Sequence, residues 1–462
     1  MRMPTIVLAP AALLLVSSVA LAQPQSRQAP PAAGAPRPFT VPAAETFSLP
    51  NGLGVTLVPY GTVPKATIHL SVDVGNADEG PQQVWLADLT GQLMKEGTTT
   101  QSAAAIAERL ARMGGGLTVG VGLDATTVRT DVLSEFVADA LPVIADVVQH
   151  PALPAAELPR LKADLRRNLA LQKSQPQAQA FEAFSRVMYG DHPYGRIFPT
   201  EAMLEGYGHG DVTAFHAAHF GASRAHLYVV GRFDAAAVRA AVRASFASWA
   251  AGTAPRRTVA TPVVTRSLTV IDRPKAAQST LYLGLPVVDP SHPDYMALRV
   301  MNALLGGSFA SRVTTNIREQ KGYTYSPNSS LTPRQKVAHW AQVADVTTAV
   351  TGASMKEIFF EIDRLRTEAP PVAELDGIKA YLSGVFVLQN SSRSGIINQL
   401  LFQRQHGLPE DYLRTYVQQL QAVTPDDIRR VTEKYLDPAK MTMVVVGDQA
   451  VVKEQLQPYE AH

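Results

Sequence analysis

Apolar residues recur along this chain at two different spacings, and the spacing changes from one segment to the next. Residues 51–60 (NGLGVTLVPY) and 66–75 (ATIHLSVDVG) alternate apolar with polar positions, which predicts two β-strands. Helical spacing follows over 82–95 and again over 102–113. Residues 117–132 return to alternation around a short glycine-containing turn, so we expect a hairpin there.

Helical periodicity then dominates residues 134–187, with interruptions near Pro151 and Pro176. A further helix is predicted from Asp211, and it leads into a strand over 225–231 (AHLYVVG). Strands and helices are therefore mixed without a regular βαβ alternation, which favours an α+β fold.

The same succession begins again after residue 267. Residues 250–267 contain proline and threonine but no helical period, which is typical of an interdomain linker. The sequence therefore predicts a duplicated unit, with homologous α+β domains over 44–249 and 268–455. The repeated residues are Pro64-Lys65 and Pro274-Lys275, Gly97 and Gly307, Asp211 and Asp427, and Gly231 and Gly447.

The first 43 residues differ in composition from the rest. Arg2 precedes a mostly apolar run, and Ala20-Leu21-Ala22 has the small-x-small pattern of a cleavage site, so residues 1–22 are interpreted as a secretory signal peptide. Residues 23–43 are rich in proline, alanine and glutamine, and we expect a disordered linker. In a Gram-negative bacterium the mature chain would be periplasmic; a retained anchor is the alternative, and we expect no stable membrane insertion.

Charge and cysteine content exclude several classes of function. With 42 basic and 40 acidic residues the formal net charge is +2, which gives no reason to expect nucleic acid or an anionic membrane as a partner. The chain has no cysteine, which excludes disulfides, thiolate zinc sites and a cysteine nucleophile.

Residues 306–330 (GGSFASRVTTNIREQKGYTYSPNSS) form the segment with the clearest chemistry. Phe309, Val313 and Ile317 recur at four-residue spacing, which predicts the buried face of a helix that Ser308 could cap. Gly322 stands where a left-handed residue would end that helix.

Two tyrosines follow this predicted helix. Tyr323 and Tyr325 alternate as residues on one face of a strand do. Arg318, in the last helical turn, would then lie near Tyr325, and a permanent cation and a phenol O–H would converge on one acceptor atom.

The string GGSF-x-SR-x-x-x-NIRE-x-KGYTY resembles the C-terminal signature of the M16 (pitrilysin/insulinase-like) metallopeptidases. This resemblance implies two homologous α+β domains that form half of a clamshell, in the M16/LuxS-type metallohydrolase fold. It also implies that Arg318 and Tyr325 bind substrate and assist catalysis.

Active members of that family carry an HxxEH zinc motif on the helix after the second strand, and this chain departs from it. The corresponding helix reads Asp88-Leu89-Thr90-Gly91-Gln92, so Asp88, Gly91 and Gln92 replace both histidines and the catalytic glutamate. A third ligand, a glutamate, would fall between Glu157 and Glu182, where Asp164 is the only carboxylate. We therefore expect no metal in this chain.

The remaining histidines do not replace the motif. His216 and His219 could share a helix face, but without a nearby carboxylate they are expected to be surface or core residues. His192 lies in GDHPYG, where proline and glycine suffice to explain a turn.

The resemblance includes heterodimeric M16 peptidases that pair a zinc-bearing chain with one that lacks zinc, and it therefore implies that this chain is the non-zinc subunit of an M16B-type zinc endopeptidase that degrades peptides or unfolded segments. Zinc would be held by a partner carrying HxxEH, and this chain would be inactive alone, supplying Arg318 for substrate binding and Tyr325 for oxyanion stabilisation. The alternative is a catalytically inactive M16 pseudoenzyme that binds peptides or acts as a scaffold. A self-sufficient peptidase with a different metal site is a third hypothesis.

Overall fold

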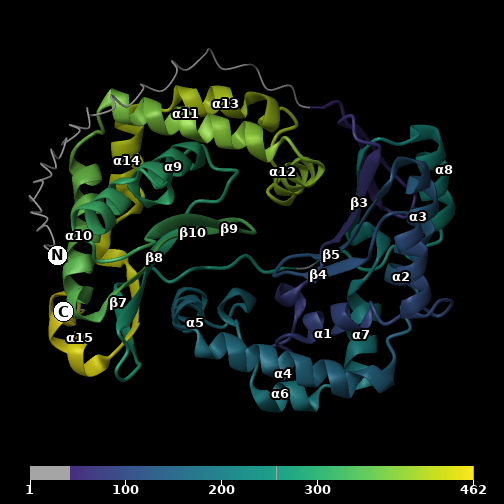
Figure 1. The fold of residues 1–462 in the computed structure, drawn as a ribbon, viewed down its shortest axis with the longest axis horizontal. Coiled ribbons are helices and arrows are strands. Elements are labelled where there is room, and N and C mark those ends of the chain that lie inside the picture. Colours follow the sequence, from purple (N-terminus) through teal and green to yellow (C-terminus); the bar gives the residue numbers. More distant parts are fainter. Residues whose placement is uncertain (1–41, 256, 461–462) are drawn as a thin grey trace, which may run out of the picture. The chain divides into compact units, whose positions relative to one another are not determined.

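The computed structural model describes residues 42–255 and 257–460, and Figure 1 shows their helices and strands. The predicted signal peptide and nearly all of the predicted disordered linker lie outside the described residues. Within the described part of the chain, no helix is both long and apolar enough to cross a membrane.

The first half of the chain forms a six-stranded sheet in the order β1-β2-β6-β3-β5-β4. Strand β6 pairs in parallel with β2, and all the other neighbours are antiparallel. The predicted strands and the predicted hairpin are confirmed. The strands are β1 (Glu45–Ser48), β2 (Gly54–Pro59), β3 (Lys65–Val72), β4 (Thr118–Val121), β5 (Thr126–Leu133) and β6 (Ala225–Gly231).

Helices accompany this sheet, and all of those described in this half except α5 contribute to its apolar core. Ser102 begins the second of them by accepting the backbone N–H of Ala105 at 3.2 Å, and proline opens the fifth. The helices are α1 (Leu86–Leu93), α2 (Ala103–Arg112), α3 (Val137–Gln149), α4 (Leu158–Ser174), α5 (Pro176–Tyr189), α6 (Glu201–Gly206), α7 (His209–His219) and α8 (Ala235–Phe246).

The second half repeats this topology in a five-stranded sheet, in the order β7-β11-β8-β10-β9. Its parallel pair, β7 with β11, corresponds to β2 with β6, and the remaining neighbours are again antiparallel. The duplication predicted from a few repeated residues is therefore present in the fold. The strands are β7 (Ser267–Asp272), β8 (Gln278–Val287), β9 (Asn328–Arg334), β10 (Val337–Thr347) and β11 (Thr442–Gly447).

The helices of the second half follow the same succession. They are α9 (Tyr295–Asn302), α10 (Thr351–Thr367), α11 (Val372–Gln389), α12 (Arg393–Gln405), α13 (Tyr412–Ala422), α14 (Pro425–Tyr435) and α15 (Gln449–Leu456). Two wide helical turns, η6 (Ala303–Gly307) and η7 (Thr314–Gln320), stand between α9 and β9.

Each half contributes one helix to the sheet of the other. Helix α5 packs on β8 and β11, where the ring centroids of Phe184 and Tyr282 are 4.5 Å apart. Helix α12 packs on β3 and β6, and Ile396 and Ile397 join Tyr228 in a small apolar cluster. The two halves are thus linked by packing as well as by the chain itself.

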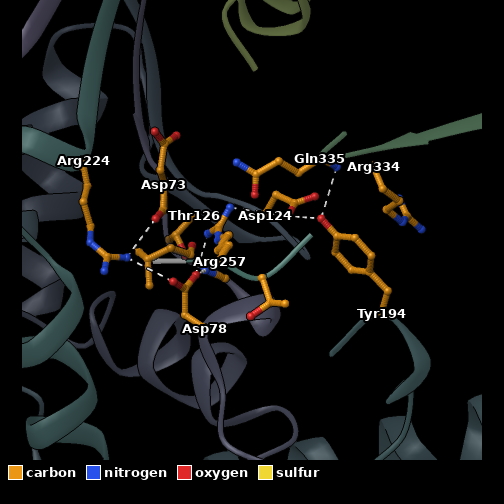
Figure 2. A network of polar contacts seen from close by, with 12 residues as sticks. Asp73, Asp78, Asp124, Thr126, Tyr194, Arg224, Arg257, Arg334 and Gln335 are labelled. Carbon is orange, nitrogen blue, oxygen red and sulfur yellow. Dashed lines mark hydrogen bonds and ion pairs between the residues drawn. The ribbon is translucent and has the colours of Figure 1, made fainter. Parts of the chain in front are cut away.

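A buried polar network connects the segment between α8 and β7 to the first sheet (Figure 2). The carboxylate of Asp78 accepts hydrogen bonds from Arg224 at 3.1 Å and from Arg257 at 2.5 Å. Arg257 also reaches Asp124 at 3.4 Å, and Asp124 accepts the hydroxyl of Tyr194 at 2.8 Å. This segment, described apart from residue 256, contains no helix or strand, and these side chains hold it together with backbone hydrogen bonds such as Val263 N–H to the carbonyl of Met188 at 2.8 Å.

Candidate functional site

The segment that carries the predicted catalytic pair is less regular than its periodicity indicated. The helix expected from Ser308 begins only at Arg312, and Ser308 does not cap it: among the described residues its buried hydroxyl has no hydrogen-bond partner. Ser311 instead accepts the backbone N–H of Thr314, at 3.4 Å. Val313 and Ile317 are buried as predicted, but Phe309 precedes the helical register and is 69% exposed.

The end of the segment keeps its predicted glycine but not its predicted strand. Gly322 has a φ of +64°, a left-handed conformation that glycine adopts without strain. Tyr323 and Tyr325 lie outside any strand, because only Thr324 forms an isolated bridge, to Val346, and β9 begins at Asn328. The expectation of strand alternation there is therefore wrong.

Arg318 and Tyr325 nevertheless come together. The guanidinium carbon of Arg318 lies 4.7 Å from the ring centroid of Tyr325 and 4.6 Å from that of Phe309. Its Nε is 3.1 Å from a carboxylate oxygen of Glu319. The cation therefore stacks against two aromatic rings, and the ring of Tyr325 is 77% exposed and open to another molecule.

Sequence reasoning missed the second ring. Phe309 was assigned to the helix core because it stands four residues before Val313, and the extended backbone at Ser308 removes it from that face. The signal that could have indicated the bend is the pair of glycines just before it. An added Cβ at Gly306 would lie 2.4 Å from Gln342, and one at Gly307 would lie 2.4 Å from Asn302, so both positions need a bare backbone.

The degenerate zinc-motif positions lie on α1. Asp88 accepts a hydrogen bond from the side-chain amide of Asn76 at 2.7 Å, and the same amide donates to Glu79 at 3.1 Å. Burial raises the pKa of the Asp88 carboxyl above its usual range, and it raises the pKa of Glu79 to about 8. Glu79 also accepts the backbone N–H groups of Trp85 and Ala87, so these acids organise the first turn of α1.

The other positions where metal ligands would be expected do not provide a zinc site either. A Cβ at Gly91 would lie 2.5 Å from a methyl group of Val121, which leaves no room for a glutamate without movement of β4. Asp164 is engaged by Arg160 and Arg167 on the surface of α4. Among the described residues, no group of three or more histidines, cysteines or acids could hold a metal ion.

Two amides of α4 line the place where a third ligand would be expected. Asn168 and Gln172 border a cavity of about 250 Å³ together with Asp88 and Asn76. The side-chain amide of Gln172 donates to Asn168 at 3.2 Å. Neutral amides in these positions are poor zinc ligands, so the residues present do not fit the family's metal.

The histidines that remained as weak candidates have structural roles. His216 contacts the carbonyl oxygen of Val148 at 3.1 Å and stacks on Phe220, and burial lowers its pKa. Burial also lowers the pKa of His219, which packs against Phe215. His192 contacts the carbonyl oxygen of Thr258 at 2.9 Å and begins a short turn at Pro193.

Comparison with known families and proteins gives consistent matches along the chain. Residues 55–199 match the family model described as insulinase (peptidase family M16), and residues 208–382 match the one described as the peptidase M16 inactive domain. An uncharacterised zinc protease of Mycobacterium tuberculosis is 26% identical over 366 residues, which cover 78% of this chain and 81% of the relative. The uncharacterised zinc protease YmxG of Bacillus subtilis is 26% identical over 281 residues, covering 61% and 68%.

Solved structures support the same grouping. A peptidase M16 inactive domain from Pseudomonas fluorescens superposes with a TM-score of 0.80 at 26% identity, over 87% of this chain and 98% of that one. A protease from Helicobacter pylori has the same fold, with a TM-score of 0.81 at 20% identity over 88% and 100% of the two chains.

Proposed function

The chain belongs to peptidase family M16, and from that premise we propose that it is the non-zinc subunit of a two-chain zinc endopeptidase. The observation that carries this proposal is the contrast between two sites in one molecule. Arg318 packs against the exposed Tyr325, whereas Asp88, Gly91 and Gln92 belong to no group of described residues that could hold a metal ion.

The stack suits recognition of a peptide carbonyl. Phe309 and Tyr325 pack against the guanidinium group of Arg318. The N–H donors of a guanidinium lie in its plane, so a substrate carbonyl would approach Arg318 from the edge of that plane. The hydroxyl of Tyr325 is a neutral donor on an exposed ring, suited to the oxyanion that forms when a peptide carbonyl is attacked. Arg318 would bind peptide carbonyls and hold the tyrosine ring in place.

The partner in this proposal is a second M16 chain with an intact HxxEH motif. Its zinc would activate the attacking water, and this chain would contribute the donors described above. The substrates would be peptides or unfolded segments. The signal-like residues 1–22 support a periplasmic location for the complex.

A scaffold or peptide-binding pseudoenzyme is the second candidate, favoured by the filled surroundings of α1. Two contacts stabilise that helix without a metal: Asn76 donates a hydrogen bond to Asp88, and Val121 packs against Gly91. In that case the Arg318 and Tyr325 side chains would not affect turnover in any complex.

Reconstitution distinguishes the two candidates. The mature chain alone should contain far less than one zinc per molecule and should not cleave an unstructured peptide. Mixed with a zinc-bearing M16 chain encoded beside it, it should form a complex by size and raise chelator-sensitive turnover above that of the partner alone. Stoichiometric zinc with activity in the lone chain would refute the proposal, and a complex without increased turnover would favour the scaffold.

A further inference from the structure

The cavity beside α1 is lined by two arginines and an aromatic wall, which the loss of the zinc motif does not explain. It has a volume of about 250 Å³ and is bordered by residues from both halves of the chain. Asp88 lies on α1, Asn168 lies on α4, Arg196 follows α5, and Arg334 ends β9.

The cavity has more positive than negative charge. Among the described residues, neither Arg196 nor Arg334 forms an ion pair. Arg196 donates to the backbone carbonyl of Glu79 at 2.9 Å, and Arg334 lies 5.6 Å from the ring centroid of Tyr194, as its position beside that ring in Figure 2 also shows. The Nε of Arg334 is buried and has no hydrogen-bond partner in the described chain.

Asp88 does not balance these two cations. Among the described residues that line the cavity, Asp88 is the only acid. One of its oxygens already accepts a hydrogen bond from Asn76, and burial raises the pKa of its carboxyl, which favours the neutral form. Both arginine side chains are partly buried, and an anion that enters the cavity would accept charge-assisted hydrogen bonds from them, including one from the unpaired Nε of Arg334.

One side of the cavity is apolar and aromatic. Trp85 and Phe198 meet edge to face with ring centroids 6.1 Å apart, and the indole N–H of Trp85 is held by the carbonyl of Ile197 at 3.1 Å. Phe181 and Leu165 complete this wall. Sites for whole small-molecule ligands commonly measure roughly 300–1,000 Å³, so this cavity has room for little more than one side chain with its charged group.

We propose that this cavity binds the C-terminal residue of a peptide, with the terminal carboxylate at Arg196 and Arg334 and an apolar last side chain against Trp85 and Phe198. A bare inorganic anion would satisfy the guanidinium groups but would leave the aromatic wall without a contact. The site goes beyond the proposed function, because it needs neither the partner subunit nor zinc and can be measured on this chain alone.

The test compares two ligands that differ in one group. An N-acetylated tripeptide ending in leucine is titrated calorimetrically into the mature chain, first as the free acid and then as the C-terminal amide. The free acid should bind at least about tenfold more tightly, since charge-assisted hydrogen bonds are lost in the amide. Equal affinities for the two peptides, or no binding by either, would overturn the proposal.

Matched variants then locate the site. Arg334→Gln and Arg196→Gln should each remove most of the difference between acid and amide. Arg166→Gln is the control, because Arg166 also carries a guanidinium but its side chain is 49% exposed near Glu201 and Glu205. If the control changes binding as much as the other two variants, the carboxylate is bound elsewhere and the proposal fails.

Inorganic phosphate provides the last comparison. The peptide acid should bind more tightly than phosphate, because only the peptide contacts the aromatic wall. Phosphate that binds in an arginine-dependent way while the peptide acid does not would show a simple anion site and refute the peptide assignment. Thermal melts confirm that each variant is folded, and the comparison of acid with amide on the unaltered chain does not depend on any variant.

Discussion

Phe309 shows how a single residue can change the account of a site. Its spacing from Val313 is helical, yet it lies outside the helix and packs against the guanidinium of Arg318 at 4.6 Å. A cation held by two rings loses less freedom when it binds a substrate, because its orientation is already restricted. The sequence alone predicted that Arg318 and Tyr325 would be close. Helical spacing placed Phe309 on the buried face instead, and the adjacent pair Gly306-Gly307 was the sequence signal for the bend that brings in the second ring.

Removing the second ring should weaken the enzyme without abolishing it. In the reconstituted complex, Phe309→Ala should reduce kcat/KM about two- to fivefold, because it removes one exposed cation–π contact. Phe309→Tyr keeps a ring over Arg318 and should restore most of the activity. A full loss of turnover in Phe309→Tyr, or no change in Phe309→Ala, would contradict the stacking role.

The residues of α1 lead to a second prediction, that restoring the zinc motif will fail. Asp88→His, Gly91→Glu and Gln92→His together recreate HxxEH, but a side chain at position 91 meets Val121, and Asn168 and Gln172 replace any nearby glutamate on α4. Catalytic zinc sites usually need three protein ligands with supporting contacts. Elemental analysis of the triple variant should therefore find well below one zinc per chain. Stoichiometric zinc with robust peptidase activity would show that a ligand, such as Asp164, is already in place.

At the scale of elements, alternation predicted the strands but does not indicate what covers each face. Thr67, His69 and Ser71 alternate with apolar residues along β3, which is typical of a strand with one face in water. All three are buried, because α12 from the second half packs on that face. One of the contacts there is polar: Arg393 donates to the hydroxyl of Thr67 at 3.2 Å. Arg393 and Thr67 are 326 residues apart in the sequence, and local periodicity cannot indicate a contact over such a separation.

The segment between α8 and β7 depends on buried charges rather than on regular structure. The side chains of Arg257 and Asp78 are 9% and 4% exposed, and Arg257→Ala would remove one of the two ion-pair partners that the described chain gives Asp78 and would also remove the ion pair with Asp124. Breaking a buried pair by removing one partner typically costs about 3–5 kcal/mol. Chemical denaturation should therefore show a large loss of stability in Arg257→Ala.

The control for that measurement is an ion pair on the surface. Arg112→Ala removes a contact with Glu108 in which both side chains are more than half exposed, at 78% and 65%. Exposed pairs are worth about 0–1 kcal/mol, so this variant should denature almost as the unaltered chain does. Equal losses in both variants would contradict a structural role for the buried network.

At the scale of the whole molecule, the two halves share one strand order apart from β1, but their corresponding helices have different surroundings. The few repeated residues were enough to predict the duplication, because glycines such as Gly97 and Gly307 serve turns and close contacts in both copies. They could not predict that α5 and α12 cross between the sheets, since each helix is amphipathic whichever sheet it covers. The predicted domains 44–249 and 268–455 are units of the sequence repeat, and α5 and α12 pack each unit against the other.

The central claim is that a chain without a metal site contributes directly to peptide hydrolysis by its partner. Tyr325→Phe removes one oxygen from an exposed ring and should leave folding, assembly and the stack with Arg318 intact. Loss of one oxyanion donor typically lowers kcat by ~10²–10³. Tyr323→Phe is the matched control, because that tyrosine is half-buried two residues away and no ring contact with Arg318 is found for it in the described chain.

The measurement is kcat on an unstructured peptide, with each variant mixed with the zinc-bearing partner and the complex confirmed by size. We expect a loss of ~10²–10³ for Tyr325→Phe and a loss of about threefold or less for Tyr323→Phe. If Tyr325→Phe and Arg318→Ala both assemble and both keep kcat near that of the unaltered complex, this chain is a scaffold and the account is wrong.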